Sequence, residues 1–312
     1  MARPASARHP WRVVMNPGIA TLLGLLEREA YVTDRSVATA LFRAGALERP
    51  LLVEGPPGVG KTEIAKVLAR ARSADLIRLQ CYEGLDVSTA LYEWNYPKQL
   101  LRIKLDEQVA LTAPVEQREA AIFSEPFLLK RPLLQAITHP GAPPVLLIDE
   151  VDRSDEEFEA FLLELLSDFQ VTIPEIGTVR ATSRPAVVLT SNRTRELSEA
   201  LRRRCLYLWI DYPTLEKELR IIRLKVPAAG DRLAAQIAAF MQSLRRMELS
   251  RLPGVAETLD WATALVALAA PELDESVVRE TLGCFIKDRG DADRLLRELD
   301  AGHFAVMASI VA

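Results

Sequence analysis

The sequence predicts an α/β fold in which a five-stranded parallel sheet is covered by helices on both faces. Two observations predict it. Five short apolar runs lack polar alternation and are separated by helical patterns, as expected of strands buried on both faces. The first run also leads through a glycine-rich loop into a helix, the order found in phosphate-binding folds. The expected strands lie at residues 50–54, 76–81, 145–149, 186–191 and 205–210.

The bulk composition is that of an ordinary globular protein. Of the 312 residues, 49% are hydrophobic and 26% are charged, and the net charge is −4. This balance gives no reason to expect a binder of nucleic acid or of an anionic membrane. The three cysteines, Cys81, Cys205 and Cys284, lie far apart and form no ligand-spaced cluster with the three histidines. We therefore expect reduced thiols and no structural metal.

Hydropathy favours a cytoplasmic protein. No apolar run approaches the roughly 20 residues of a membrane-spanning helix, and the first residues show no apolar segment followed by a small-residue cleavage site. We therefore expect no integral membrane segment. Residues 1–16 combine basic residues with alanine and proline, which favours a disordered basic tail.

The glycine-rich loop after the first run follows the pattern G-x-x-x-x-G-K-[ST] and predicts a nucleoside triphosphate ligand. Glycines let successive backbone N–H groups curl around phosphate oxygens, and the following helix N-terminus adds a partial positive charge. Lys61 would reach the β and γ phosphates, and Thr62 would give its hydroxyl to Mg²⁺. The expected nucleotide-binding residues are Gly55, Pro56, Pro57, Gly58, Val59, Gly60, Lys61, Thr62 and Glu63.

Adenine is the expected base. The sequence has no N-K-x-D segment of the kind that reads guanine, so ATP is a better candidate than GTP. Tyr31 and Val32 are candidate adenine contacts, although both residues would also fit the protein core.

The third run ends in Asp149 and Glu150, a hydrophobic strand followed by two carboxylates. Asp149 would hold the Mg²⁺ shell, and Glu150 would polarise the water that attacks the γ-phosphate. An acidic pair alone is weak evidence because an aspartate often begins a helix. The phosphate loop about 90 residues upstream makes the catalytic interpretation strong.

The next segment predicts a helix and then a hairpin. Apolar residues from Phe158 to Phe169 recur at helical spacing on one stripe, which indicates a core-facing helix. Ser154 and Glu157 suggest a capping box at its start. Residues 170–184 then combine β-type residues with a turn that contains proline and glycine, which predicts a β-hairpin ahead of the fourth strand.

Two further sites carry both a functional and a structural interpretation. Asn192, at the end of the fourth strand, could fix the attacking water or touch the γ-phosphate, but an asparagine there could also serve the turn. The helix before the fifth strand ends in three arginines, Arg202, Arg203 and Arg204. The helix dipole favours positive charge at a C-terminus, which would be a purely structural reason for them. An arginine finger that acts on a neighbouring subunit's site is the sharper hypothesis, and it implies an oligomeric ring.

The order of these motifs resembles the AAA+ ATPases and more narrowly the MoxR family. Segments 79–86, 92–96 and 169–175 are similar to the CoxD-like accessory ATPases of carbon monoxide dehydrogenase maturation. The resemblance spans most of residues 25–290. It implies a hexameric ring, ATP-driven remodelling of a client metalloenzyme of the molybdenum hydroxylase type, and a partner with a von Willebrand factor A domain.

The resemblance also assigns domains and residues. It implies a nucleotide-binding core at residues 17–212 with an insert at about 85–134 in the second helix, and an α-helical lid domain at residues 213–312. By position, Lys61 and Thr62 form the Walker A pair, Asp149 and Glu150 form the Walker B pair, and Asn192 is the sensor. The finger is Arg204, with Arg203 second. The lid segment 254–261 has no arginine at the place of the family's lid sensor, so the role falls to Arg251 or another residue, or the lid senses nucleotide differently.

Two alternatives stay open beside the remodelling ATPase. A nucleic-acid-stimulated motor should have basic loops, but residues 93–131 contain as many acidic as basic side chains. A scaffold that binds nucleotide without hydrolysing it is disfavoured by the intact Glu150.

Overall fold

The computed structural model describes residues 17–108 and 114–308, so the predicted basic tail lies outside the described residues. Five parallel strands form the central sheet in the order β2-β5-β8-β1-β9. The predicted α/β fold with a five-stranded parallel sheet is therefore confirmed. The strands are β1 (Leu51–Glu54), β2 (Leu76–Gln80), β5 (Val145–Asp149), β8 (Ala186–Ser191) and β9 (Leu206–Trp209).

Burial of both strand faces holds only for the middle of the sheet. Every residue of β1 and β5 is buried, as are all but the first of β8. The two edge strands differ from the expectation: β2 has a single buried residue, and β9 exposes Tyr207 and Trp209. An edge strand lacks a neighbour on one side, and the helical layers end before they cover it, so an apolar run alone does not separate an edge strand from a central one.

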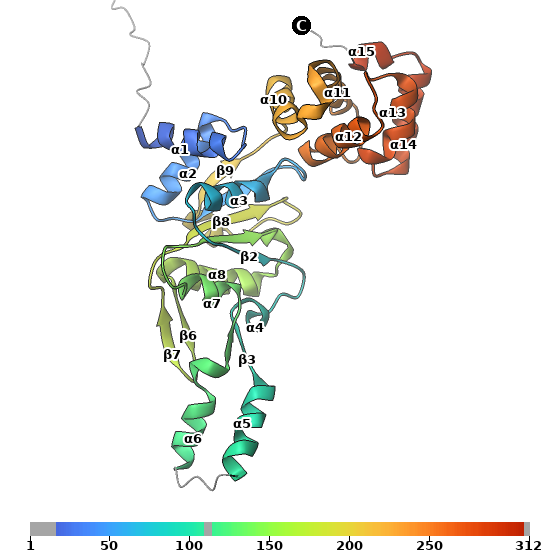
Figure 1. The fold of residues 1–312 in the computed structure, drawn as a ribbon. Helices are drawn as coiled ribbons and strands as arrows, with labels where there is room; N and C mark the ends of the chain where they lie inside the picture. The colour runs from blue at the N-terminus through green and yellow to red at the C-terminus, as the bar shows by residue number, and fades with distance from the viewer. Residues whose placement is uncertain (1–16, 109–113, 309–312) are drawn as a thin grey trace, which may run out of the picture.

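Helices cover both faces of the sheet and form two separate apolar layers (Figure 1). Above the sheet in Figure 1 lie α1 (Pro17–Arg28), α2 (Arg35–Ala46) and α3 (Lys61–Ala71). The opposite face packs against α7 (Pro132–Ile137), α8 (Glu156–Asp168) and α9 (Glu199–Arg204).

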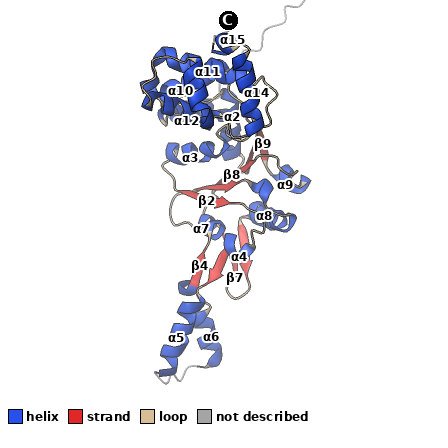
Figure 2. Ribbon diagram, turned by 90° about the vertical axis from the view of Figure 1, so that its right-hand side faces the viewer, coloured by secondary structure: helices blue, strands red, loops and turns tan. Residues whose placement is uncertain are grey.

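The segment between β2 and α7 builds a projection from the core. It begins with α4 (Val87–Ala90), and β3 (Tyr92–Trp94) and β4 (Leu128–Lys130) then pair antiparallel. Between these strands lie α5 (Tyr96–Gln108), α6 (Val115–Ile122) and the short η1 (Glu125–Phe127). We call α5 and α6 the arm. Figures 1 and 2 show the arm pointing away from the sheet, at the opposite end of the molecule from the C-terminal helices.

The helix after β5 starts differently from the prediction. A short turn, η2 (Val151–Arg153), precedes α8, and Asp155 caps α8 by accepting a hydrogen bond from Phe158 N at 2.8 Å. The predicted Ser154–Glu157 capping box is therefore wrong, because the Ser154 hydroxyl donates to Val151 O instead. The predicted apolar stripe of α8 is buried apart from Phe161, which is half-buried, and a hairpin of β6 (Gln170–Ile173) and β7 (Gly177–Arg180) follows it.

The C-terminal helices pack around a core of their own. Its centre is an aromatic cluster in which the Trp261 ring lies 5.3 Å from Phe240 and 4.4 Å from Phe285 between centroids. We call this unit, from residue 213 on, the lid; this boundary stays a prediction, and the separate core supports it. The lid helices are α10 (Leu215–Lys225), η3 (Pro227–Ala229), α11 (Gly230–Leu244), α12 (Val255–Ala267), α13 (Glu275–Thr281), η4 (Leu282–Cys284), α14 (Arg289–Asp300) and α15 (Phe304–Ala308).

Among the described residues no helix combines the length and the apolar character needed to cross a membrane.

Candidate functional site

The phosphate loop connects β1 to α3 in the backbone shape that its glycines allow. Gly58 and Gly60 have φ values of 76° and 91°, which side chains rarely adopt, and Gly60 directly precedes the first turn of α3. Position 55 requires glycine because a Cβ there would lie 2.0 Å from the carbonyl oxygen of Ile210. The loop therefore presents backbone N–H groups at a helix N-terminus.

Lys61 is folded back over this loop. Its Nζ donates to Gly55 O at 2.8 Å and to Pro56 O at 2.6 Å. Burial lowers the pKa of Lys61 from its ordinary value, while the nearby carboxylates of Asp152, Asp149 and Glu150 act in the opposite direction. The Lys61 cation suits a polyanionic ligand, and the carboxylates suit a metal cation bound with that ligand.

The carboxylate of Asp149 is held from two sides. On one side, Oδ1 accepts hydrogen bonds from the Thr62 hydroxyl at 3.0 Å and the Thr190 hydroxyl at 2.5 Å. On the other side, the Arg78 guanidinium donates to Oδ2 from the neighbouring strand β2, at 2.6 Å from Nη2. The structure therefore brings the predicted metal ligands, Thr62 and Asp149, into direct contact.

Glu150 lies at the tip of β5 with its carboxylate beside the cavity. Its backbone is left-handed, at a φ of 55°, and its N–H donates to Thr190 Oγ1 at 2.9 Å. The carboxylate makes an ion pair with Arg153 at 2.9 Å and is 32% exposed. This partial exposure leaves Glu150 accessible to water while Arg153 limits its motion.

Asn192 is held by a residue that the sequence interpretation missed. Its backbone N–H lies 3.2 Å from both oxygens of Asp152, which also accepts hydrogen bonds from the N–H and hydroxyl of Thr194. Asp152 is 3% exposed, so it fixes the turn after β8 from inside the protein. In the sequence, Asp152 is distinguished only by its place two residues after Glu150, and this spacing does not predict a contact with the turn after β8.

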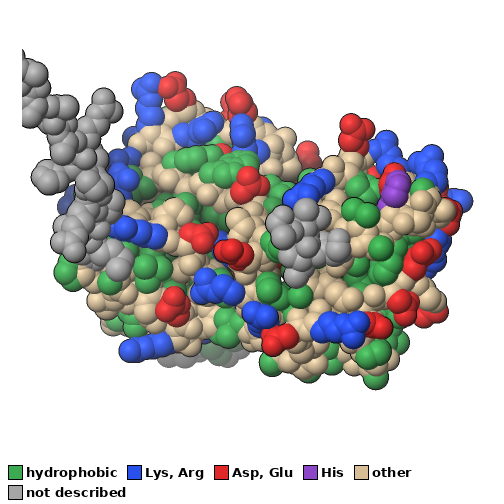
Figure 3. Space-filling model, turned by 90° about the horizontal axis from the view of Figure 1, so that it is seen from above, with side chains coloured by type: hydrophobic (Ala, Val, Ile, Leu, Met, Phe, Trp, Pro, Cys, Tyr) green, Lys and Arg blue, Asp and Glu red, His purple; other side chains and the backbone are tan. Residues whose placement is uncertain are grey.

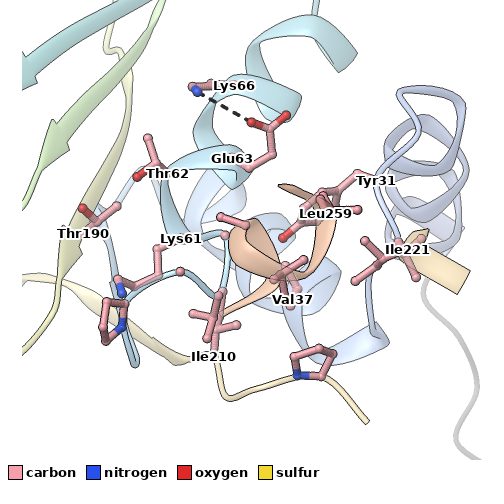
Figure 4. A pocket seen from close by; sticks show the side chains of 18 of the residues that line it. Tyr31, Val37, Lys61, Thr62, Glu63, Lys66, Thr190, Ile210, Ile221 and Leu259 are labelled. Carbon is pink, nitrogen blue, oxygen red and sulfur yellow. Dashed lines mark ion pairs between the residues drawn. The ribbon is translucent and has the colours of Figure 1, made fainter. Parts of the chain in front are cut away.

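A cavity of about 590 Å³ runs from this polar cluster to the lid (Figure 4). Lys61, Thr62 and Thr190 lie toward one end in Figure 4, while Tyr31 and Ile221 lie toward the other. Burial raises the pKa of Tyr31, and so do the charges of Glu63 and Asp34. The apolar side chains that line the cavity include Tyr31, Val32, Val37, Ile210, Pro213, Ile221, Val255 and Leu259.

The predicted finger arginines are not among the residues that line the cavity. Arg203 makes an ion pair with Glu199 on its own helix, and Arg204 donates to the Ser167 hydroxyl at 2.7 Å. The last carbonyls of α9 are instead satisfied by Arg49, which donates to Arg203 O and Arg204 O. The three arginines are thus not required as caps of α9.

Comparison with known families decides the class. Residues 51–209 match the family described as "ATPase family associated with various cellular activities (AAA)". The chain belongs to the AAA family. This AAA ATPase is therefore an ATP-hydrolysing enzyme, as the loop and the acidic strand end predicted.

Curated relatives of this AAA ATPase are distant. Gas vesicle ATPase GvpN2 of Halobacterium salinarum is 26% identical over 280 residues, which cover 85% of this chain and 76% of the relative. An uncharacterized protein of Staphylococcus haemolyticus is 26% identical over 233 residues, covering 72% of this chain and 78% of that protein. Among solved structures, a mutant of RuvB from Thermotoga maritima has 18% identity and a TM-score of 0.49, covering 88% and 81% of the two chains.

The residues of this AAA ATPase fit a nucleotide and a hard cation. A volume of about 590 Å³ lies within the range of about 300–1,000 Å³ of small-molecule sites. The polar end offers loop N–H groups and Lys61, and the Thr62 hydroxyl and Asp149 carboxylate provide the oxygen atoms that Mg²⁺ prefers. The apolar end offers a surface for a base.

Proposed function

We propose that this AAA ATPase hydrolyses ATP in the cavity between its core and its lid, as one subunit of a ring that remodels a client protein. One observation supports the chemistry above all: Thr62, Asp149, Thr190 and Glu150 converge at the polar end of the cavity, directly below the phosphate loop. The apolar end, with Tyr31 and Val32, would then receive adenine.

The roles follow from the chemistry of each group. Thr62 and Asp149 would hold Mg²⁺, which when bound offsets charge on the phosphate oxygens. Lys61 would leave its loop carbonyls for the β and γ phosphates. Glu150 would accept the proton of the attacking water as the new bond to the γ-phosphorus forms and the bond to the bridging oxygen breaks, giving ADP and phosphate. The Asn192 amide would orient that water.

A ring would complete this site. Arg204, with Arg203 second, would enter the site of the neighbouring subunit and stabilise the charge that develops on the γ-phosphate. The positions of Arg203 and Arg204 outside the cavity of their own chain support action in trans. A hexamer is the stoichiometry implied by the resemblance to the MoxR family.

The proposed biological role is MoxR-type remodelling. The resemblance to CoxD-like ATPases suggests a client metalloenzyme of the carbon monoxide dehydrogenase type and a partner with a von Willebrand factor A domain. The similarity to a gas vesicle ATPase supports a MoxR-type ATPase in the wider sense. The exposed apolar side chains of α5, among them Tyr96, Leu100 and Leu101, support contact between the arm and another protein.

A nucleic-acid motor receives less support. Figure 3 shows acidic and basic side chains interspersed over the face that is seen from above, without a continuous basic surface there. The balanced charge of residues 93–131 agrees with this.

The test is affinity purification from the native host with Glu150→Gln as the bait, in the presence of ATP. We expect the variant to retain a von Willebrand factor A protein and a metalloenzyme, and light scattering to report a hexamer. Capture of neither protein by the bait, together with ATPase stimulation by DNA, would refute the remodelling role. The matched bait is Lys61→Ala, which should not bind ATP and should lose the client.

A further inference from the structure

The lid contacts the phosphate loop through a pair of glycines. A Cβ added to Gly254 would lie 2.6 Å from both Cα and C of Gly58, and one added to Gly58 would lie 3.0 Å from Gly254 Cα. Gly254 is the residue directly before α12, and its φ is −88°. Any residue adopts that backbone angle, so the backbone conformation does not require glycine at position 254. The close approach to Gly58, which leaves no room for a Cβ, does require it.

Backbone hydrogen bonds join the same two segments. Gly58 O accepts from Val255 N at 2.8 Å and from Ala256 N at 3.4 Å. These N–H groups belong to the first turn of α12, where a helix offers no internal partner. Gly254 N is satisfied separately by Glu257 at 2.9 Å, so the phosphate loop takes two donors that would otherwise face water.

A buried ion pair holds the start of α12 in place. Arg245, the residue directly after α11, donates through Nη1 and Nη2 to the carboxylate of Glu218 of α10, at 2.6 and 2.7 Å, and their side chains are 6% and 0% exposed. Arg245 Nε also donates to Pro253 O at 2.8 Å, directly before Gly254. The hydroxyl of Thr258, in the first turns of α12, donates to Glu218 at 2.7 Å.

The same pair reaches the connection between core and lid. Gln242 donates to Glu218 and to Pro213 O, and the Arg245 guanidinium lies 5.1 Å from the centroid of the Tyr212 ring. Tyr212 and Pro213 connect β9 to α10. One buried pair therefore ties the connection, α10, α11 and the start of α12 into a single unit whose contact with the core includes Gly58.

We propose that Gly254 and Arg245 are positioning residues that latch the lid onto the phosphate loop and so couple lid closure to nucleotide binding. The inference rests on the proposed ATP site. Residues 254–261 contain no arginine that could serve as a lid sensor, and the backbone contact of α12 with the loop would take over that role. Arg251, the other candidate sensor, is exposed and does not line the cavity. Because Val255, Ala256 and Leu259 line the cavity, a released lid would leave its apolar end open.

The first test is Gly254→Ala, with Gly283→Ala as the matched lid control because a Cβ at Gly283 meets nothing within 4 Å. Hydrogen exchange of residues 255 and 256 is measured without nucleotide. We expect slow exchange in the parent and in Gly283→Ala, and fast exchange in Gly254→Ala. Fast exchange in the parent would overturn the latch, whatever the ATPase activity, so this result is separate from failure of the proposed function.

Nucleotide affinity gives the second readout of Gly254→Ala. When the latch is lost, only a fraction of the molecules has the lid closed before ATP binds. Part of the binding free energy then closes the lid, so the apparent affinity for ATP falls in proportion to that fraction. We expect the Kd for ATP to rise about tenfold, the size of about one net hydrogen bond, with no change in Gly283→Ala. An unchanged Kd in Gly254→Ala would contradict the coupling.

Arg245→Lys tests the buried pair. Lysine keeps the charge but cannot bind both oxygens of Glu218 and Pro253 O together. We expect the KM for ATP to rise about tenfold and kcat to change less than about twofold, together with faster exchange at residues 255 and 256. Equal losses of kcat and kcat/KM, with protection retained, would show that Arg245 does not act through the lid.

Discussion

Glu150 combines an unfavourable backbone with a reactive position. A left-handed conformation costs a residue other than glycine on the order of 1–3 kcal/mol and persists where its surroundings over-determine it. Here the Glu150 N–H is bound by Thr190, and its carbonyl accepts from Arg153 N at 2.9 Å. The strained backbone places the Glu150 carboxylate beside the polar end of the cavity, as its proposed role in hydrolysis requires.

Replacing Glu150 with glutamine should separate binding from hydrolysis. The amide keeps the shape of the side chain but cannot accept the proton of water, so we expect turnover to fall by about 10² or more and ATP affinity to be retained. Phosphate release and equilibrium binding measure the two effects. Glu164→Gln, an exposed position on α8, should change neither, and equal turnover in Glu150→Gln and parent would refute the role of Glu150.

Asp152 offers a test of the turn that carries Asn192. In Asp152→Asn a single acceptor oxygen replaces two, so some of the N–H groups of Asn192 and Thr194 lose their partner. We expect turnover to fall by about 10- to 100-fold through misplacement of Asn192, with a loss of about 1–3 kcal/mol in the free energy of unfolding. Urea denaturation and phosphate release report these values. An active, less stable variant would limit Asp152 to a structural role.

At the scale of elements, α8 and α9 show where side-chain identity determines a helix end. Asp155 caps α8, although Ser154 had the better sequence pattern, because η2 turns the Ser154 hydroxyl toward Val151 O. The C-terminus of α9 is capped by Arg49 from another part of the core. The α8 cap is thus decided by the local turn at the helix start, whereas the α9 cap comes from a residue distant in the sequence.

The cap of α8 can be tested directly. Asp155→Ala should lower the free energy of unfolding by about 1 kcal/mol, the usual cost of a lost N-cap. Glu157→Gln should change it by less than about 0.5 kcal/mol, because the capping box that would need Glu157 is not formed. Chemical denaturation compares the two variants. A larger loss in Glu157→Gln than in Asp155→Ala would reverse our assignment.

The proposed action of Arg204 across subunits would make α9 an element shared between neighbouring sites. We expect Arg204→Ala to lower turnover by about 10³, because a finger arginine is worth that much or more, while ATP binding is kept. Mixing it with Lys61→Ala should restore part of the activity, since a subunit that binds ATP then meets a neighbour with its arginine. Phosphate release from the mixture is the measurement. If the mixture stays inactive while both variants assemble, Arg204 is not the finger.

At the scale of the whole molecule, the cavity joins two units with separate hydrophobic cores. Its lining comes from α3, β5 and β8 in the core and from α10 and α12 in the lid. A ligand there contacts both units at once and should stabilise them together.

ATP should therefore raise the stability of the entire chain. At a concentration 100-fold above its Kd, a ligand that binds only the folded state adds about 2.7 kcal/mol to the free energy of unfolding. We expect this gain in Glu150→Gln, monitored by fluorescence of Trp261 and the other tryptophans in denaturant. Lys61→Ala should show no gain. Stabilisation of Glu150→Gln that is confined to the core would mean that the lid does not contact the ligand.

The sequence predicted the parts of the site that follow one another along the chain. The phosphate loop, Asp149, Glu150 and Asn192 stand at ends of apolar runs, and the order of parallel strands brings such ends together. It could not predict Arg78 on Asp149, because that contact depends on the register between β2 and β5. Nor could it predict Arg245 and Glu218, since two charged residues in helical patterns look solvent-exposed until three helices surround them.

The arm enters and leaves the core at adjacent points. β3 and β4 are three residues long, and Asn95 N donates to Phe127 O at 2.8 Å directly beyond them. The chain therefore returns to where it left. Phe123 still packs on Trp94 of the core, but the parts of α5 and α6 farther out can lengthen, shorten or change composition without disturbing the sheet. In evolutionary terms, the arm, which is the proposed contact with a partner, is free to diverge at its own rate, while the catalytic strands remain under the constraint of the nucleotide.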